Sequence, residues 1–216
     1  KKFKQSFLKL IPLSHQMSKD TRFLSLLSAV QLELKDFTAR QRTLKVLCDV
    51  ADTVQHQLMY MSQLLENNLY NAALDVGFVL QARSLAVDEK NHLYSMMSKI
   101  YIHENDFEGL AEIVHSYELE SLATDQYYYS KSILNLNQAD EMLALESLRS
   151  AVVQNQNFDQ GWVALALLHD KMGDQDLSMA NLEKALDVNP LNAAALKHFS
   201  KKSILSGSVD KAVEKI

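Results

Sequence analysis

The chain has 216 residues, of which 47% are hydrophobic and 23% are charged, and its formal net charge is −5 at pH 7. The acidic balance argues against a nucleic-acid-binding surface, which usually shows as a basic domain. Five Gly and two Pro are too few for a β-rich or loop-rich fold, so long helices are favoured. The single cysteine, Cys48, excludes an internal disulfide and suits a reducing compartment, and we expect a cytoplasmic protein.

Residues 1–19 begin with the basic and apolar run KKFKQSFLKLIPL. Lys4 and Lys9 interrupt the apolar stretch and no small-residue cleavage site follows, so we expect a helix or linker rather than a signal peptide. No run approaches the roughly 20 apolar residues that a membrane span needs. Because the chain lacks an initiator Met and ends inside a repeat at Ile216, we expect it to be a piece of a longer protein.

Equivalent residues recur with a step of 34 along the second half of the chain, at Asp106, Asp140, Asp174 and Ser208. Eight residues after the last three, apolar residues keep the same step at Leu148, Leu182 and Ile216. A period of this length is typical of stacked helix–turn–helix units. The sequence therefore predicts an all-α solenoid, which indicates binding rather than catalysis.

Capping chemistry predicts where the helices start, because an Asp or Asn ahead of an apolar run accepts a bond from a first-turn amide. The first helix of each pair is expected to start at Asp20, Asp52, Asp88, Asp125, Asp159 and Asn192. The second is expected to start near Asp36, Asn68, Asp106, Asp140, Asp174 and Ser208. Gly173 and Gly207 suit left-handed helix ends. These starts define units of about 20–53, 54–87, 88–124, 125–158, 159–192 and 193–216.

The segment 162–190 resembles a tetratricopeptide repeat, through Trp162, Leu165, Ala166, His169, Ser178, Leu182, Ala185 and Pro190. The resemblance is closest over 125–216 and looser over 20–124. It implies a right-handed superhelix of about six stacked antiparallel helix pairs. We expect Trp162 and Ala185 to be buried, with Tyr128 in the core position equivalent to Trp162.

The resemblance also implies a concave groove lined by particular positions of the first helices, where a protein or peptide would bind. Carried onto this chain, these positions are Lys99, His103, Tyr129, Ile133, Asn137, Val163, Leu167, Lys171, Lys197 and Lys201. The lysines toward the C-terminal end could hold an acidic group, although the Lys/Asn/Arg set of the family's carboxylate clamp is missing. Tyr129 could anchor a peptide or pack between units. The alternative for the lysines is a solvated helix face.

No motif for catalysis or metal binding is present: the chain has no Gly-rich phosphate loop, and His103-Glu104 lacks the second His of a His-Glu-x-x-His site. Cys48 has only Lys45 as a nearby cation in the sequence, so an inert packed thiol is expected. We therefore predict no enzymatic activity, no cofactor and no metal.

The sequence thus predicts a scaffold or adaptor that binds a peptide or protein, without nucleic acid and without a membrane span, and it leaves a homo-oligomer open. The alternative is an output or regulatory segment of a signalling protein. Lys2, Phe3, Leu8 and Ile11 faintly resemble the last turn and helix of a receiver domain, although the proline of that turn is absent. A plain capping helix is the competing interpretation of this stretch.

Overall fold

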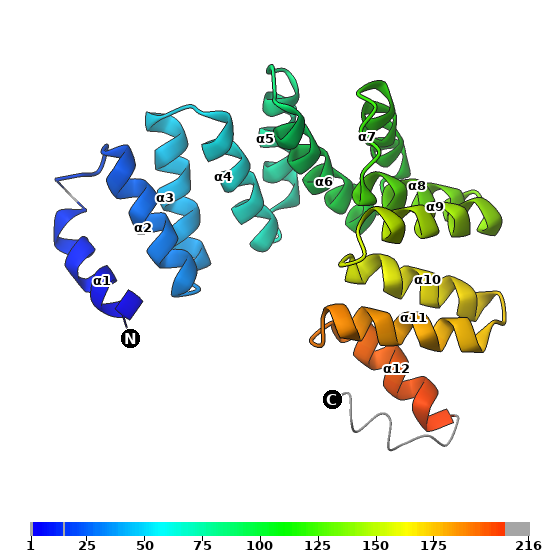
Figure 1. Ribbon diagram of the computed structural model, residues 1–216. Helices are drawn as coiled ribbons and strands as arrows, with labels where there is room; N and C mark the ends of the chain where they lie inside the picture. Colours follow the sequence, from blue (N-terminus) through cyan, green and yellow to red (C-terminus); the bar gives the residue numbers. More distant parts are fainter. Residues whose placement is uncertain (1, 15, 206–216) are drawn as a thin grey trace. The chain divides into compact units, whose positions relative to one another are not determined.

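The computed structural model describes residues 2–14 and 16–205, and all regular structure within these ranges is helical (Figure 1). A 3₁₀ turn, η1 (Ile11–Leu13), follows the first helix. The α-helices are α1 (Lys2–Leu10), α2 (Thr21–Glu33), α3 (Phe37–Val50), α4 (Val54–Glu66), α5 (Tyr70–Gln81), α6 (Val87–Glu104), α7 (Phe107–Leu119), α8 (Asp125–Asn137), α9 (Glu141–Gln154), α10 (Asp159–Lys171), α11 (Gln175–Val188) and α12 (Ala193–Leu205). The predicted all-α fold is confirmed.

The helices form two compact units, residues 1–100 and residues 101–216, with α6 crossing the boundary. In unit 1, α1 packs on α2, α2 pairs with α3, α3 packs on α4, and α4 pairs with α5. Gly77 of α5 is buried against Met61 of α4 and Met97 of α6, which would lie 3.2 and 3.3 Å from an added Cβ. The small residue therefore allows three helices to approach closely.

In unit 2 the contacts run stepwise from α7 to α12, with the tightest pairing inside the hairpins α8–α9 and α10–α11. One core cluster joins α9 to α10 through Leu145, Leu148, Leu165 and Leu168. A second cluster joins α10, α11 and α12: Val163, Ala166, Leu182, Ala185, Leu186, Ala195 and Phe199. Because each cluster crosses from one hairpin to the next, stacking closes the core.

Two of the expected core aromatics are placed differently from the prediction. Ala185 is fully buried, as expected, but Trp162 is only half-buried. Its Nε1 donates to the Gln156 carbonyl oxygen at 2.9 Å, and Lys184 Nζ lies 4.4 Å from the ring centroid. These polar partners hold the indole at the rim of the core. Tyr128, at the equivalent position, is also half-buried.

Most of the predicted caps are present. The side chains of Asp20, Asp36, Asp106, Asp140, Asp174 and Asn192 each accept a bond from the amide three residues on. Elsewhere the prediction is wrong by a residue. Thr53 and Thr124 cap α4 and α8 in place of the neighbouring aspartates, because the threonine hydroxyls reach the first-turn amides. The prediction is also wrong at α6, which starts at Val87, and at α5 and α10, which lack a side-chain cap.

The turn before each second helix contains one left-handed residue. These residues are Lys35, Asn68, Asn105, Ala139 and Gly173, with φ between 56° and 87°. After Gly173, the Asp174 amide donates to the His169 carbonyl at 2.9 Å, which closes the helix end in the Schellman manner. Gly207 and the second helix expected near Ser208 lie outside the described residues. The boundaries of the six expected units stay a prediction.

Candidate functional site

Side-chain contacts link the first helices of unit 2, α8, α10 and α12. The ring of Tyr129 meets the ring of Phe158 edge-on, with centroids 5.4 Å apart, just before α10 begins. Phe199 of α12 shares a core cluster with α10, and Lys202 of α12 forms an ion pair with Asp170 of α10. These contacts connect each first helix of unit 2 to the next.

Each of these helices presents two side chains one turn apart. Ile133, Leu167 and Lys201 recur every 34 residues, as do Asn137 and Lys171, whereas Lys197 is equivalent to the buried Val163. We call the resulting surface the first-helix face: Ile133, Asn137, Leu167, Lys171, Lys197 and Lys201. Leu167 is 39% exposed, Ile133 is half-buried, and the polar members are exposed. Lys171 Nζ lies 2.8 Å from Glu141 Oε1, so this lysine is already paired.

The remaining residues predicted for the groove are not all on this face. Val163 is buried in the core between α10 and α12, and we leave it out of the proposed surface. Tyr129 is half-buried, and burial raises the pKa of its hydroxyl. His103 is exposed and its Nδ1 lies 3.0 Å from Glu104 Oε1. Lys99 is exposed but belongs to unit 1, so it is described apart from the others.

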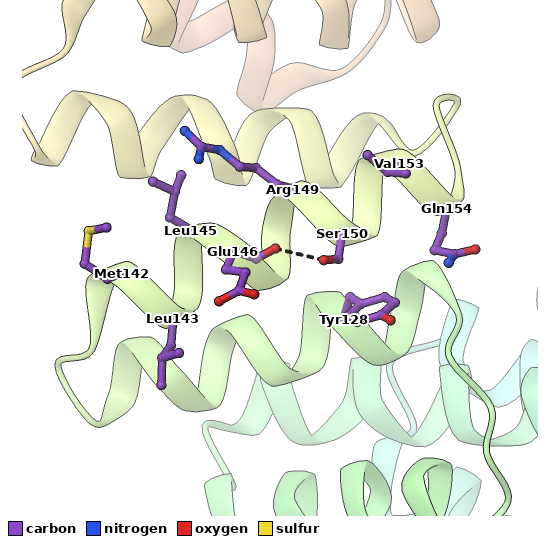
Figure 2. Close-up of a pocket in the computed structure, with 9 residues that line it drawn as sticks. All are labelled: Tyr128, Met142, Leu143, Leu145, Glu146, Arg149, Ser150, Val153 and Gln154. Carbon is purple, nitrogen blue, oxygen red and sulfur yellow. Dashed lines mark hydrogen bonds between the residues drawn. The ribbon is translucent and has the colours of Figure 1, made fainter.

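A pocket of about 530 Å³ lies on the α8–α9 hairpin, where the sequence did not predict one (Figure 2). Tyr128 comes from α8 and the other lining residues come from α9. Met142 and Val153 are 67% and 75% exposed. Ser150 Oγ donates to the Glu146 carbonyl oxygen at 3.0 Å. The pocket thus combines exposed apolar side chains with a half-buried aromatic ring.

A second pocket, of about 450 Å³, repeats this arrangement one hairpin later. Trp162 takes the position of Tyr128, and α11 contributes Lys184, Asp187 and Val188. Val153 borders both pockets. The 34-residue step between Tyr128 and Trp162 was visible in the sequence, but it was interpreted only as core packing.

In each of the two hairpins, a side-chain hydrogen bond joins the residue after the second helix to the first residue of the first helix. We call this bond the clamp. The Asn155 amide donates to Asp125 Oδ2 at 2.7 Å, and the Asn189 amide donates to Asp159 Oδ2 at 2.6 Å. Asn192 donates a second side-chain bond to Asp159 Oδ2, at 2.9 Å. Sequence analysis missed this clamp, although its members recur with the step of 34.

The carboxyl group of Asp159 has a pKa below its usual value. Burial raises this pKa, but the hydrogen bonds from Asn189 and Asn192 and from the Gln160 amide lower it by more. The charged form is therefore the one that the clamp stabilises.

The described residues offer little for catalysis. No group of three or more His, Cys, Asp or Glu side chains among them is placed to hold a metal. The pKa of the Cys48 thiol is raised to about 11, first by burial and then by Asp49 and Asp52, so it is protonated at neutral pH. Within the same ranges, no helix has the length and apolar character for crossing a membrane.

No protein-family model matches the chain, and no curated protein matches it in sequence. Solved structures do match in fold. The APC/C hetero-tetramer Cut9-Hcn1 aligns with a TM-score of 0.73 at 10% identity, over 99% of this chain and 42% of that chain. This chain thus spans less than half the length of that match. TTC0263, a thermophilic TPR protein of Thermus thermophilus, aligns with a TM-score of 0.67 at 17% identity, over 85% and 99% of the two chains.

These identities are low, so the likeness is one of fold. The chain has the tetratricopeptide-repeat (TPR) fold, as the sequence predicted. The human IFIT1 dimer with PPP-AAAA, an RNA ligand, aligns with a TM-score of 0.66 at 11% identity, over 99% of this chain and 53% of that chain. The fold by itself therefore does not exclude nucleic acid, and that expectation depends on the acidic balance alone.

Proposed function

We propose that the chain is a non-enzymatic scaffold or adaptor that binds a segment of a partner protein on the first-helix face of unit 2. The observation that supports the proposal is the exposure of apolar and cationic side chains at repeat-related positions of three first helices. In this proposal Leu167 and Ile133 are the apolar anchors, and Lys197 and Lys201 supply the charge.

The charge on this face is only partly neutralised. Lys171 pairs with Glu141, and Lys202 pairs with Asp170. Within residues 2–14 and 16–205, no carboxylate forms an ion pair with Lys197 or Lys201. A partner segment with an acidic residue beside an apolar one complements this arrangement. The apolar contacts would supply most of the affinity, and the lysines would tune association rate and selectivity.

A pull-down with the whole chain should identify the partner, and charge reversal then tests the face. The double variant Lys197→Glu/Lys201→Glu should weaken binding about tenfold at low salt and less at high salt, because salt screens exposed charges. The helical circular dichroism signal should not change. Isothermal titration calorimetry at two salt concentrations measures the effect.

The matched control is Arg149→Glu/Lys184→Glu, which changes the net charge equally but beside the two pockets. Binding by this control should equal that of the unmodified chain. If the control loses binding while the first-helix variant retains it, the partner uses the α9–α11 side and the proposal is wrong. The role as an output segment of a signalling protein stays a prediction.

A further inference from the structure

Unit 1 has a pocket of about 260 Å³ that the proposed function does not use. It is lined by α3, α4 and α5, through Cys48, Gln57, Tyr60, Asp75, Val76 and Val79. Val79 is 52% exposed and Phe78 beside it is 51% exposed. The pocket therefore offers a thiol, an aromatic ring and two valines to an apolar side chain.

Carboxylates surround this apolar surface. Asp75 lines the pocket directly. Asp49 and Asp52 are close enough to Cys48 to act on its thiol electrostatically. Arg83 pairs with Asp52 at 2.8 Å and offsets one of these charges. The resulting field favours a cation over an anion beside the pocket.

Gln57 lines the pocket with a side chain that is already engaged. Its amide nitrogen donates to Asp52, and its Oε1 is buried. The charge beside the pocket, rather than this amide, therefore favours an ammonium or guanidinium group.

We propose that this pocket is a second binding site, which takes an apolar side chain flanked by lysine or arginine on a partner protein. The apolar side chain would lie against Tyr60, Val76 and Val79. The neighbouring cation would pair with Asp75. The site lies in unit 1, whereas the first-helix face lies in unit 2.

Two fluorescein-labelled helical peptides test the preference for cations. The first is acetyl-KALKALFKAL-amide, and the second, acetyl-EALEALFEAL-amide, replaces the three lysines with glutamates. The lysine peptide should bind at least about tenfold more tightly at low salt, and the difference should shrink as salt rises. Fluorescence anisotropy measures both affinities. Equal binding of the two peptides, or tighter binding of the glutamate peptide, would overturn the proposal.

Cys48 locates the bound peptide, since it is the chain's single cysteine and lines the pocket. Saturating lysine peptide should slow alkylation of Cys48 by iodoacetamide at least about fivefold, because the occupied pocket blocks access to the thiol. Intact-protein mass spectrometry follows the reaction. An alkylation rate that does not change with bound peptide would place the peptide elsewhere and overturn the proposal.

Variants of exposed residues separate the pocket from the general surface. Asp75→Asn and Val79→Lys should each weaken binding of the lysine peptide about tenfold, the first through lost charge and the second through a blocked apolar surface with added positive charge. Asp176→Asn and Val153→Lys make the same changes at exposed positions of unit 2 and should have no effect. Circular dichroism should show unchanged helicity in all four. If the control variants weaken binding as much as the pocket variants, the site is not this pocket.

Discussion

The segments α2–α3 and α8–α11 form similar helical hairpins, but only α8–α11 have the Asp–Asn hydrogen bond between the two ends of each hairpin. In α8–α11, Asn155 and Asn189 end the second helices and bond to the first residue of their own hairpin. In α2–α3 the equivalent positions are Ala51 and Thr21, which cannot form this clamp. Yet Ala51 has φ −134° and ψ 90°, close to −137° and 92° at Asn189.

This difference shows that the amide is not needed for the junction after α3. The extended conformation follows α3 without an amide side chain, as it follows α9 and α11 with one, whereas Ala82 after α5 and Glu120 after α7 have ψ of −4° and 1°. The clamp is then an added stabilisation of the regular repeats. Mutations can separate the stability that comes from the clamp from the stability that comes from the backbone of the turns.

The largest effect is expected at Asp159. Asp159→Ala removes the acceptor of two side-chain amides and should lower the free energy of unfolding by about 2–3 kcal/mol, the range for bonds to a charged group. Asp125→Ala removes the acceptor of one amide and should cost less. Urea denaturation measures both. Asp176→Ala, in the exposed first turn of α11, is the control and should change stability only slightly. Equal costs at all three positions would contradict the clamp.

Acid should weaken the same clamp by a smaller amount, because a protonated carboxyl group can still accept a hydrogen bond. The folded-state pKa of Asp159 is lowered, so its contribution to stability is complete above the unfolded value of about 3.9. The contribution is lost as the pH falls through the folded-state pKa. Urea denaturation between about pH 5 and pH 2 should therefore show a smaller acid-induced loss for Asp159→Asn than for the unmodified chain. Parallel pH profiles would show that Asp159 is not linked to folding.

The left-handed turns provide a matched pair one repeat apart. Gly173→Ala should destabilise by roughly 1 kcal/mol, because φ is +87° and a side chain is unfavourable there. No heavy atom lies within 4 Å of the added Cβ, so the cost is that of the backbone alone. Ala139→Gly, at φ 60°, should stabilise by roughly 0.5–1 kcal/mol. Thermal unfolding checks both, and changes of the same sign would be inconsistent with a backbone origin.

The smallest effect is expected at Ala51. Ala51→Asn introduces the amide of the clamp, but the carboxylate partner is absent because Thr21 takes its place. Stability should change by no more than about 0.5 kcal/mol, as for other surface substitutions. The double variant Thr21→Asp/Ala51→Asn should instead exceed the sum of its single variants in a double-mutant cycle. Strict additivity would show that the clamp cannot be transferred to unit 1.

The 34-residue period allowed the fold class and most of the helix starts to be predicted from the sequence. The period identifies equivalent positions, but it does not say how deeply each is buried. Trp162 was therefore placed in the core, whereas a carbonyl oxygen and a lysine hold it at the rim. Val163 and Leu167 were both assigned to the groove, although only Leu167 is exposed.

The pockets could not be predicted for a related reason. Two of them depend on how far neighbouring second helices stand apart over Trp162 and Tyr60, and the third depends on how Tyr128 lies against α9. Both are properties of packing. The clamp could in principle have been predicted from the sequence, since its aspartates and its asparagines both recur with the 34-residue period. Asp125 and Asp159 were instead interpreted as caps, because an aspartate before an apolar run usually has that role.

The Asp–Asn clamp also has a consequence for how the number of repeats could change during evolution. Asp159 and Asn189 belong to the same 34-residue stretch, so the bond between them closes within one hairpin. A tandem duplication of that stretch would copy both partners at once. The inserted hairpin would arrive with its clamp complete, without a compensating change in its neighbours. A junction of this kind lets the length of the array change by whole repeats during evolution.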